Sequence, residues 1–169
     1  FDGPERGIGR FQTNRPWETC DVIAGAWAYN GESVPASKSD VLKALTKIAG
    51  NGGNLLLGTG PRPDGTIVDK HVTRLKDIGA YLNEYGESIY ETKGGPYISG
   101  AWGSSTHKDN KIYLHLMGNL VDDKIKLPAL PAIITGYKTL TGDINVKIDN
   151  SSKGLFLSYT GEKNKINSI

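Results

Sequence analysis

A run of three leucines that leads directly into a turn-forming segment constrains the fold of this chain more than any other feature. The run is Leu55–Leu57, and Gly58–Pro61 follows it without a break. Three apolar residues without polar alternation predict a strand covered on both faces, as in a parallel sheet surrounded by helices. Helical patterns flank the run, so the sequence predicts a unit of a βα barrel, with a ligand site near the end of this strand.

The segments on either side of the leucine run carry apolar residues at helical spacing. Ser37–Asp40 offers side chains that can cap a helix, and the apolar pattern continues from Val41 until Gly50 ends it. Downstream, Asp69 is predicted to cap a second helix that stops at Gly86. The predicted order is therefore helix, strand, helix.

Beyond Gly95 the apolar period changes from that of a helix to that of a strand. Alternating segments occur at Ile112–Met117, Lys124–Leu127 and Leu155–Tyr159, with turn-forming residues between them. Short strands with frequent turns predict an antiparallel β-sandwich. The sequence thus predicts two parts, with residues 1–93 as the C-terminal portion of a (β/α)8-like catalytic domain and residues 94–169 as a β-sandwich domain.

The predicted barrel part is too short to close a barrel. An α/β barrel takes about 250 residues, and residues 1–93 hold only its last one or two βα units. We therefore expect the remainder of the barrel in another chain or in a missing N-terminal part of a longer enzyme. At the other end, residues 165–169 are expected to begin a final strand.

Composition and charge exclude several classes of partner. With 37% hydrophobic and 22% charged residues, the 169-residue chain can bury a core. A net charge of +2 without a basic run gives no basis for nucleic-acid binding, and no apolar run reaches the roughly 18 residues of a membrane helix. Cys20 is the sole cysteine, and His71, His107 and His115 are widely scattered, so we expect no metal and no cofactor.

Several motifs follow one another along the chain in a specific order and spacing. They are Trp17–Cys20, Ala26–Asn30, Gly52–Pro61 with Asp64–Ile67, and Gly86–Thr92. Together they resemble the second half of the catalytic domain of family 29 α-L-fucosidases. Trp102–Thr106, Ile112–Leu116 and Leu140–Gly142 are similar to the C-terminal β-sandwich of that family. The resemblance covers nearly the whole chain.

This resemblance implies a retaining exo-glycosidase that removes terminal α-L-fucose by double displacement. Such chemistry uses two carboxyl groups about 5 to 5.5 Å apart, a nucleophile and a proton shuttle, and needs no cofactor. In similar enzymes the nucleophile is an aspartate several tens of residues before the Trp-Glu motif, which places it upstream of this chain. The implied partners are a fucosylated glycan or L-fucose and the remainder of the barrel, and the chain by itself is expected to be inactive.

The resemblance also assigns the acid/base. Many relatives carry this glutamate in a Thr-Pro-Glu type segment about a dozen residues before the tryptophan, and Glu5 lies 12 positions before Trp17. We assign the role to Glu5, although Gly3 replaces the usual threonine. The alternative is a solvated carboxylate near a chain end, as most glutamates are. Glu18 is expected to support the barrel floor through a buried hydrogen bond.

Trp27 is the predicted substrate-binding residue. It follows Val22–Ala26, a run that predicts another barrel strand, and an aromatic ring at the end of such a strand can offer a flat apolar face to a pyranose. An aromatic at the matching position lines the fucose pocket of similar enzymes. The alternative is core packing; Tyr29 and Asn30 are expected only to shape the loop.

The glycine-rich segment after the leucines is not a phosphate-binding loop. Gly58–Pro61 lacks the Gly-Lys-Ser/Thr ending that such a loop requires, so it predicts a strand exit followed by a turn at Pro63–Gly65.

The residues leave two other functions open. One is a non-catalytic carbohydrate-binding or interaction module with Tyr97 and Trp102 as an exposed platform, and the other is a barrel glycosidase of different sugar specificity.

Overall fold

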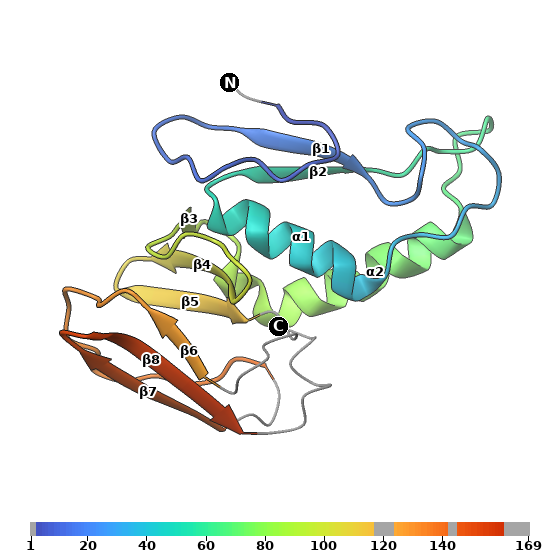
Figure 1. Ribbon diagram of the computed structural model, residues 1–169. Helices are drawn as coiled ribbons and strands as arrows, with labels where there is room; N and C mark the ends of the chain where they lie inside the picture. Colours follow the sequence, from blue (N-terminus) through green and yellow to red (C-terminus); the bar gives the residue numbers. More distant parts are fainter. Residues whose placement is uncertain (1–2, 117–123, 142–144, 161–169) are drawn as a thin grey trace.

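The computed structural model describes residues 3–116, 124–141 and 145–160 (Figure 1). In chain order the elements are β1 (Glu18–Val22), α1 (Lys38–Gly50), β2 (Asn54–Gly58), α2 (Asp69–Tyr85), the 3-10 turn η1 (Gly86–Ser88), β3 (Lys93–Gly94), β4 (Gly103–Lys108), β5 (Lys111–Leu116), β6 (Lys124–Leu127), β7 (Asn145–Ser151) and β8 (Gly154–Thr160). Figure 1 shows α1 and α2 lying between the β1–β2 pair and two antiparallel sheets.

The leucine run forms a parallel strand, as predicted. β2 pairs with β1 in parallel register from Glu18 opposite Asn54 to Val22 opposite Gly58. On the other side of β1, Glu5 forms an isolated parallel bridge with Cys20, through hydrogen bonds from the Cys20 N–H to Pro4 O and from the Arg6 N–H to Cys20 O. Three chain segments therefore run parallel in this part of the molecule.

The two predicted helices are present, but only the first begins as expected. Ser37 is the N-cap of α1, and its hydroxyl accepts the Asp40 N–H at 3.1 Å. The prediction that Asp69 caps α2 is wrong, because Asp69 is the first helical residue and the N-cap is the buried Val68. At that position the negative charge of Asp69 still interacts favourably with the positive, N-terminal end of the helix dipole. Gly86 is the C-cap of α2, as predicted.

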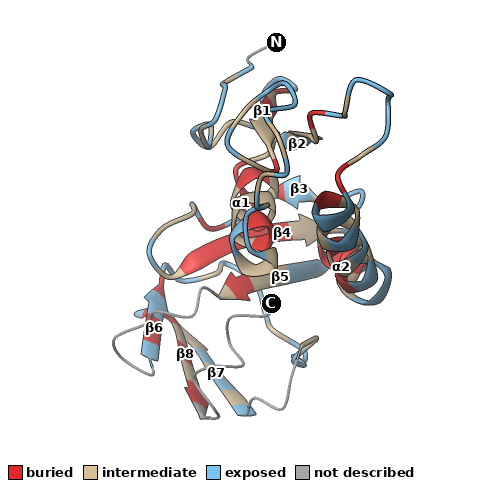
Figure 2. Cartoon of the chain, turned by 90° about the vertical axis from the view of Figure 1, so that its right-hand side faces the viewer, coloured by how far each residue is buried: buried red, intermediate tan, exposed pale blue. Residues whose placement is uncertain are grey.

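The core beside β2 lies on one face of the strand only. Val41, Leu42, Ile78 and Tyr81 form a buried cluster between the helices, with Leu57 packed against it. Leu56 points to the opposite face, because side chains alternate along a strand, and it is 47% exposed. The prediction of a strand covered on both faces is therefore wrong for the described chain. Figure 2 shows that most of β1 and β2 is intermediate or exposed.

The C-terminal part has the predicted antiparallel strands. They form two three-stranded sheets, ordered β3-β4-β5 and β6-β8-β7. The predicted strands at 112–116, 124–127 and 155–159 coincide with β5, β6 and β8, whereas Met117 and residues 165–169 lie outside the described residues. A buried cluster that contains Ile125, Leu157 and Tyr159 packs against side chains of both sheets, as in a β-sandwich.

Tyr97 and Trp102 do not form an exposed platform. Tyr97 is only 5% exposed and belongs to the core cluster of the two sheets. Trp102 packs edge-on against it, with ring centroids 6.3 Å apart at 88°. This alternative for sugar binding is therefore wrong, because the rings are used for packing.

The first antiparallel sheet packs directly on α1. The Ser104 hydroxyl of β4 donates a hydrogen bond to Thr46 O of α1 at 2.8 Å. A Cβ atom added to Gly50 would lie 2.7 Å from the Ser104 Cβ, so only glycine allows this approach of helix and strand. The two predicted domains thus share a tight contact, and the boundary at residue 93 stays a prediction.

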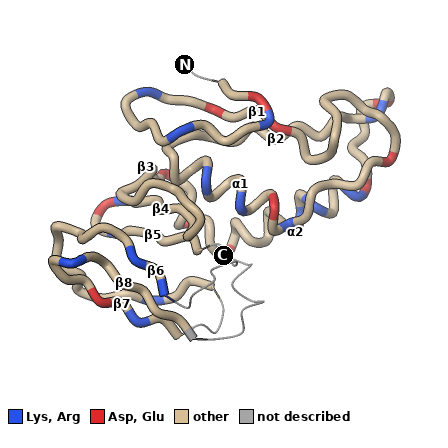
Figure 3. Tube along the Cα trace, viewed as in Figure 1, with Lys and Arg blue, Asp and Glu red and all other residues tan. Residues whose placement is uncertain are grey.

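Charged residues of both signs are interspersed over the described chain (Figure 3). Within its described part, the chain contains no helix that is both long and apolar enough to cross a membrane.

Candidate functional site

The predicted site lies where β1 and β2 end. Two loops leave these strands: the β1–α1 loop, residues 23–37, and the β2–α2 loop, residues 59–68. Because β1 and β2 are parallel, both loops begin at the same edge of the sheet. Trp27 belongs to the first loop, and Glu5 pairs with Cys20 in the middle of β1.

Glu5 is exposed in the described chain. The next residue, Arg6, has a φ of 49°, a left-handed conformation that costs energy for a side chain other than glycine. The Arg6 guanidinium donates from Nη2 to Gly25 O at 3.0 Å, and its Cζ lies 5.3 Å from the centroid of the Trp27 ring. Arg6 therefore links the segment that carries Glu5 to the loop that carries Trp27.

Trp27 lies in the loop and not at a strand end. β1 ends at Val22, and only the Ile23 N–H continues the pairing, with Gly58 O at 2.9 Å. The predicted strand at Val22–Ala26 is therefore wrong, because β1 is Glu18–Val22 and shares only Val22 with it. Trp27 is 44% exposed, so core packing does not explain it in the described chain. An exposed ring steadied by a guanidinium can stack on the apolar face of a sugar.

The Trp-Glu motif contributes packing. Trp17 is 2% exposed, and its Nε1–H donates to Gln12 O at 3.2 Å and to Asn51 O at 3.3 Å. Glu18 is half-buried, and its carboxylate makes no hydrogen bond to any residue that the structure describes. The buried hydrogen bond predicted for Glu18 is therefore absent from this part of the chain.

The β2–α2 loop contains the predicted turn. Arg62 N–H donates to Thr66 O, and Gly65 N–H donates to Arg62 O, both at 2.8 Å. Asp64 closes the turn by accepting the Thr66 hydroxyl at 2.7 Å and the Thr66 N–H at 2.9 Å. These bonds lower the pKa of Asp64, the hydroxyl having the larger effect. The turn is therefore a rigid element next to the strand exit.

The same loop touches the backbone of Trp27. Gly60 has a φ of 57°, and a Cβ atom added there would lie 3.2 Å from the Ala28 carbonyl carbon and 3.3 Å from Trp27 O. Glycine suits both the left-handed backbone and this close approach, since a side chain here would be strained and tightly packed. The strand exit thus supports the tryptophan through its main chain.

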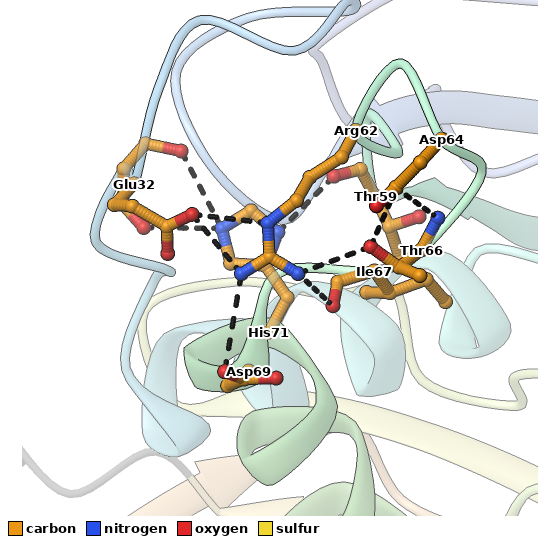
Figure 4. A network of polar contacts seen from close by, with 9 residues as sticks. Glu32, Thr59, Arg62, Asp64, Thr66, Ile67, Asp69 and His71 are labelled. Carbon is orange, nitrogen blue, oxygen red and sulfur yellow. Dashed lines mark hydrogen bonds and ion pairs between the residues drawn. The ribbon is translucent and has the colours of Figure 1, made fainter.

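A polar network connects the two loops, and no sequence signal pointed to it (Figure 4). His71, in the first turn of α2, is 2% exposed. Its Nδ1 lies 3.1 Å from Thr59 O, and its Nε2 lies 3.1 Å from Ser33 O. Beside it, Arg62 binds Glu32 Oε1 through Nε at 3.1 Å and Nη2 at 3.0 Å. Thr59 and Arg62 belong to one loop, and Ser33 and Glu32 to the other.

Among residues 3–116, 124–141 and 145–160, no three His, Cys, Asp or Glu side chains are grouped so that they could hold a metal ion. Glu5 exposes a carboxylate, Arg6 a guanidinium and Trp27 an aromatic ring in this part of the chain. A carboxyl group can transfer protons, and such polar groups with an aromatic ring can bind hydroxyl-bearing ligands.

Known proteins are similar to this chain in sequence and in fold. A family model for α-L-fucosidases matches residues 1–87. Human plasma α-L-fucosidase is 30% identical over 142 residues, which cover 78% of this chain and 29% of the relative. The α-L-fucosidase of Branchiostoma floridae is 34% identical over 108 residues, which cover 57% of this chain and 23% of the relative. The chain therefore spans less than a third of these two relatives.

Solved structures agree with the sequence comparison. The α-L-fucosidase of Vibrio sp. strain EJY3 superposes with a TM-score of 0.83 at 21% identity, over 97% of this chain and 30% of that one. The Thermotoga maritima α-fucosidase, solved in complex with fucose, gives a TM-score of 0.67 at 26% identity, over 92% of this chain and 38% of that one. Because the family model matches more than half of its residues, this chain belongs to the family 29 α-L-fucosidases.

Proposed function

We propose that the chain is the C-terminal portion of a retaining exo-α-L-fucosidase that hydrolyses terminal α-L-fucose from glycans by double displacement. The observation that supports this proposal is the contact of Arg6, the neighbour of Glu5 in sequence, with the exposed ring of Trp27, in a chain that belongs to the fucosidase family. A ligand at this edge would meet a carboxyl group and an exposed aromatic ring together.

In this mechanism Glu5 is the acid/base. An aspartate upstream of this chain attacks the anomeric carbon, while the Glu5 carboxyl gives its proton to the leaving glycosidic oxygen. A covalent fucosyl-enzyme results. The Glu5 carboxylate then takes a proton from water, and the water oxygen displaces the aspartate to release fucose with its original anomeric configuration. Because Glu5 is exposed here, we propose that the remainder of the barrel completes its surroundings.

Trp27 is proposed to bind the sugar through its exposed ring. L-Fucose carries a methyl group in place of a hydroxymethyl group, which gives one region of the pyranose an apolar surface. The half-exposed ring can cover that surface, while the Arg6 guanidinium holds the ring in place. In the Thermotoga maritima relative, fucose itself is the bound ligand.

The uncovered face of β2 supports the proposed barrel. Leu56 is 47% exposed on the face away from α1 and α2. In a closed barrel such residues fill the interior, packed against side chains of the other strands. We propose that residues 1–93 are the last βα units of this barrel and that residues 94–169 are an accessory β-sandwich.

Replacing Glu5 tests the acid/base role. In the complete polypeptide that carries this chain, Glu5→Gln should lower kcat for fucosylated glycans by about 10²- to 10⁴-fold, because their leaving groups need protonation. The loss should be smaller for the first step with an activated aryl fucoside. Added azide, which needs no base, should restore turnover and give fucosyl azide of retained α configuration.

The matched control is Glu18→Gln, which removes a carboxylate without a recorded hydrogen-bond partner among the described residues. This variant should keep kcat within a few-fold of the wild type and should not respond to azide. Equal losses in both variants, or a Glu5→Gln enzyme that is fully active on glycans, would exclude Glu5 as the acid/base.

A further inference from the structure

The β1–α1 loop is closed at its base. The Ala36 N–H donates to Ile23 O at 2.7 Å, and the Ile23 N–H donates to Gly58 O at 2.9 Å. The segment 24–35 therefore leaves and returns at the same point of the sheet, in the manner of an Ω-loop. Trp27 lies inside this segment, so its position depends on what holds the segment above its base.

His71 holds the loop from the side of α2. One ring nitrogen faces Thr59 O and the other faces Ser33, with Nε2 also 3.4 Å from the Ser33 hydroxyl. In one tautomer Nδ1–H donates to Thr59 O, and in the other Nε2–H donates to Ser33 O, so either form of the ring bonds the main chain of a loop. Because the ring is almost fully buried, water does not compete for these bonds.

Arg62 holds the same loop one residue away. In addition to its ion pair with Glu32, Arg62 donates from Nη1 to Ile67 O at 3.0 Å and to the Thr66 hydroxyl at 3.2 Å (Figure 4). Its Nη2 also lies 3.9 Å from Asp69 Oδ2. The guanidinium thus anchors Glu32 to the β2–α2 loop and to the start of α2. The Glu32 side chain is 51% exposed, so this ion pair adds little to global stability and serves to fix geometry.

Both contacts reach Trp27 through the main chain. Thr59 and Arg62 flank Gly60 and Pro61, and Gly60 lies against the backbone of Trp27 and Ala28. Moving either loop relative to the other would open this contact. The network therefore fixes the position and orientation of the Trp27 backbone relative to the ends of β1 and β2.

We propose that His71 and Arg62 are positioning residues for sugar binding: they hold the β1–α1 loop so that Trp27 is preorganised for its ligand. This inference rests on the proposed function of Trp27. Neither residue touches the sugar. Loosening the loop weakens ground-state and transition-state binding alike, which raises KM and leaves kcat nearly unchanged.

Hydrogen exchange of the complete polypeptide tests the contact itself. His71→Phe keeps the ring volume and removes both nitrogens, and Arg62→Met keeps the aliphatic stem and removes the guanidinium. Each variant should exchange amide hydrogens of residues 24–36 roughly tenfold faster than the wild type, while α1 keeps its protection. If His71→Phe does not fold, Arg62→Met carries the test, since the Arg62 side chain is partly exposed.

Kinetics with an aryl α-L-fucoside test the consequence. KM should rise about five- to tenfold in His71→Phe and in Arg62→Met, with kcat within about twofold. His71→Asn, which can still donate to Thr59 O, should recover part of the KM. The matched control is Lys108→Met, which removes the Lys108–Glu91 ion pair far from the loops and should change neither exchange at 24–36 nor KM.

The two readouts separate this inference from the proposed function. Unchanged exchange of residues 24–36 in both variants overturns the positioning role whatever the activity. A loosened loop with an unchanged KM overturns it as well. A wild-type polypeptide that hydrolyses no fucoside contradicts the proposed function, whereas the exchange experiment still decides whether the network holds the loop.

Discussion

At the residue scale, two buried histidines act through different partners. His71 connects two loops, whereas His115 of β5 lies inside the antiparallel part at 1% exposure. The Thr106 hydroxyl donates to Ser88 O at 2.6 Å, so it can only accept from His115 Nε2, 2.9 Å away. Burial lowers the pKa of His115 to about 4, with the Ser88 carbonyl acting weakly in the opposite direction. The folded protein therefore holds this ring neutral.

This lowered pKa predicts a loss of stability in mild acid. In the unfolded chain His115 takes up a proton as the pH falls below about 6.5, whereas in the folded protein it stays neutral until about pH 4. The stabilising contribution is complete above pH 6.5, decreases as the pH falls through this window, and amounts to roughly 3 kcal/mol. Urea unfolding at pH 7.5 and 4.5 measures it. His115→Gln should reduce the difference between the two pH values, His107→Gln should not, and equal differences in all three proteins would contradict the assignment.

At the element scale, local capping decides where α1 begins, while packing decides where α2 begins. Ser37 and Asp40 bind each other reciprocally, since the hydroxyl accepts the Asp40 N–H and donates to Asp40 Oδ2 at 2.6 Å. α2 has no side-chain cap, and its N-cap Val68 is fully buried. Its start is thus set by the burial of Val68 and by the Arg62 network next to it.

Removing the Ser37 cap should destabilise the protein modestly. Ser37→Ala leaves the Asp40 N–H without its acceptor and should lower the free energy of unfolding by about 1 kcal/mol. Ser37→Asn, which keeps an acceptor, should retain nearly all of it. Denaturant titrations of both variants give the comparison, and an unchanged midpoint for Ser37→Ala would show that α1 is held by packing alone.

At the scale of the whole molecule, the described chain combines a pair of parallel strands, two helices and two antiparallel sheets. α1 and α2 cover one face of β1 and β2, and the antiparallel sheets pack beyond the helices (Figures 1 and 2). The opposite face, with Leu56, is uncovered. A retaining glycosidase needs two carboxyl groups. In the proposed mechanism Glu5 supplies one of them, and an aspartate upstream of this chain supplies the other.

The isolated chain should therefore be inactive. We expect no hydrolysis of an aryl α-L-fucoside above background from the 169 residues alone, because the proposed nucleophile lies upstream of them. The complete polypeptide should turn the same substrate over, and a panel of other aryl glycosides tests its specificity. Turnover by the isolated chain at the rate of a normal glycosidase would refute the proposed division of the site.

Sequence patterns predicted elements better than they predicted the site. The helix at 38–50, the parallel leucine strand, the turn at 63–65 and three antiparallel strands were predicted from spacing and turn residues and are confirmed. The strand at 22–26 was misplaced, because its apolar run continues past the last paired residue. The network of His71 and Arg62 was missed, since its partners lie 38 and 30 residues away in sequence.

By itself the sequence determined the elements and the family, because caps, periodicity and turn residues act within a few positions and the motifs stand in a recognisable order. Only the tertiary structure decided that Leu56 and Trp27 are exposed, that Tyr97 and His115 are buried, and that α2 holds the loop of Trp27. Burial and hydrogen bonding depend on which segments distant in sequence come into contact, and a local sequence pattern does not specify those contacts.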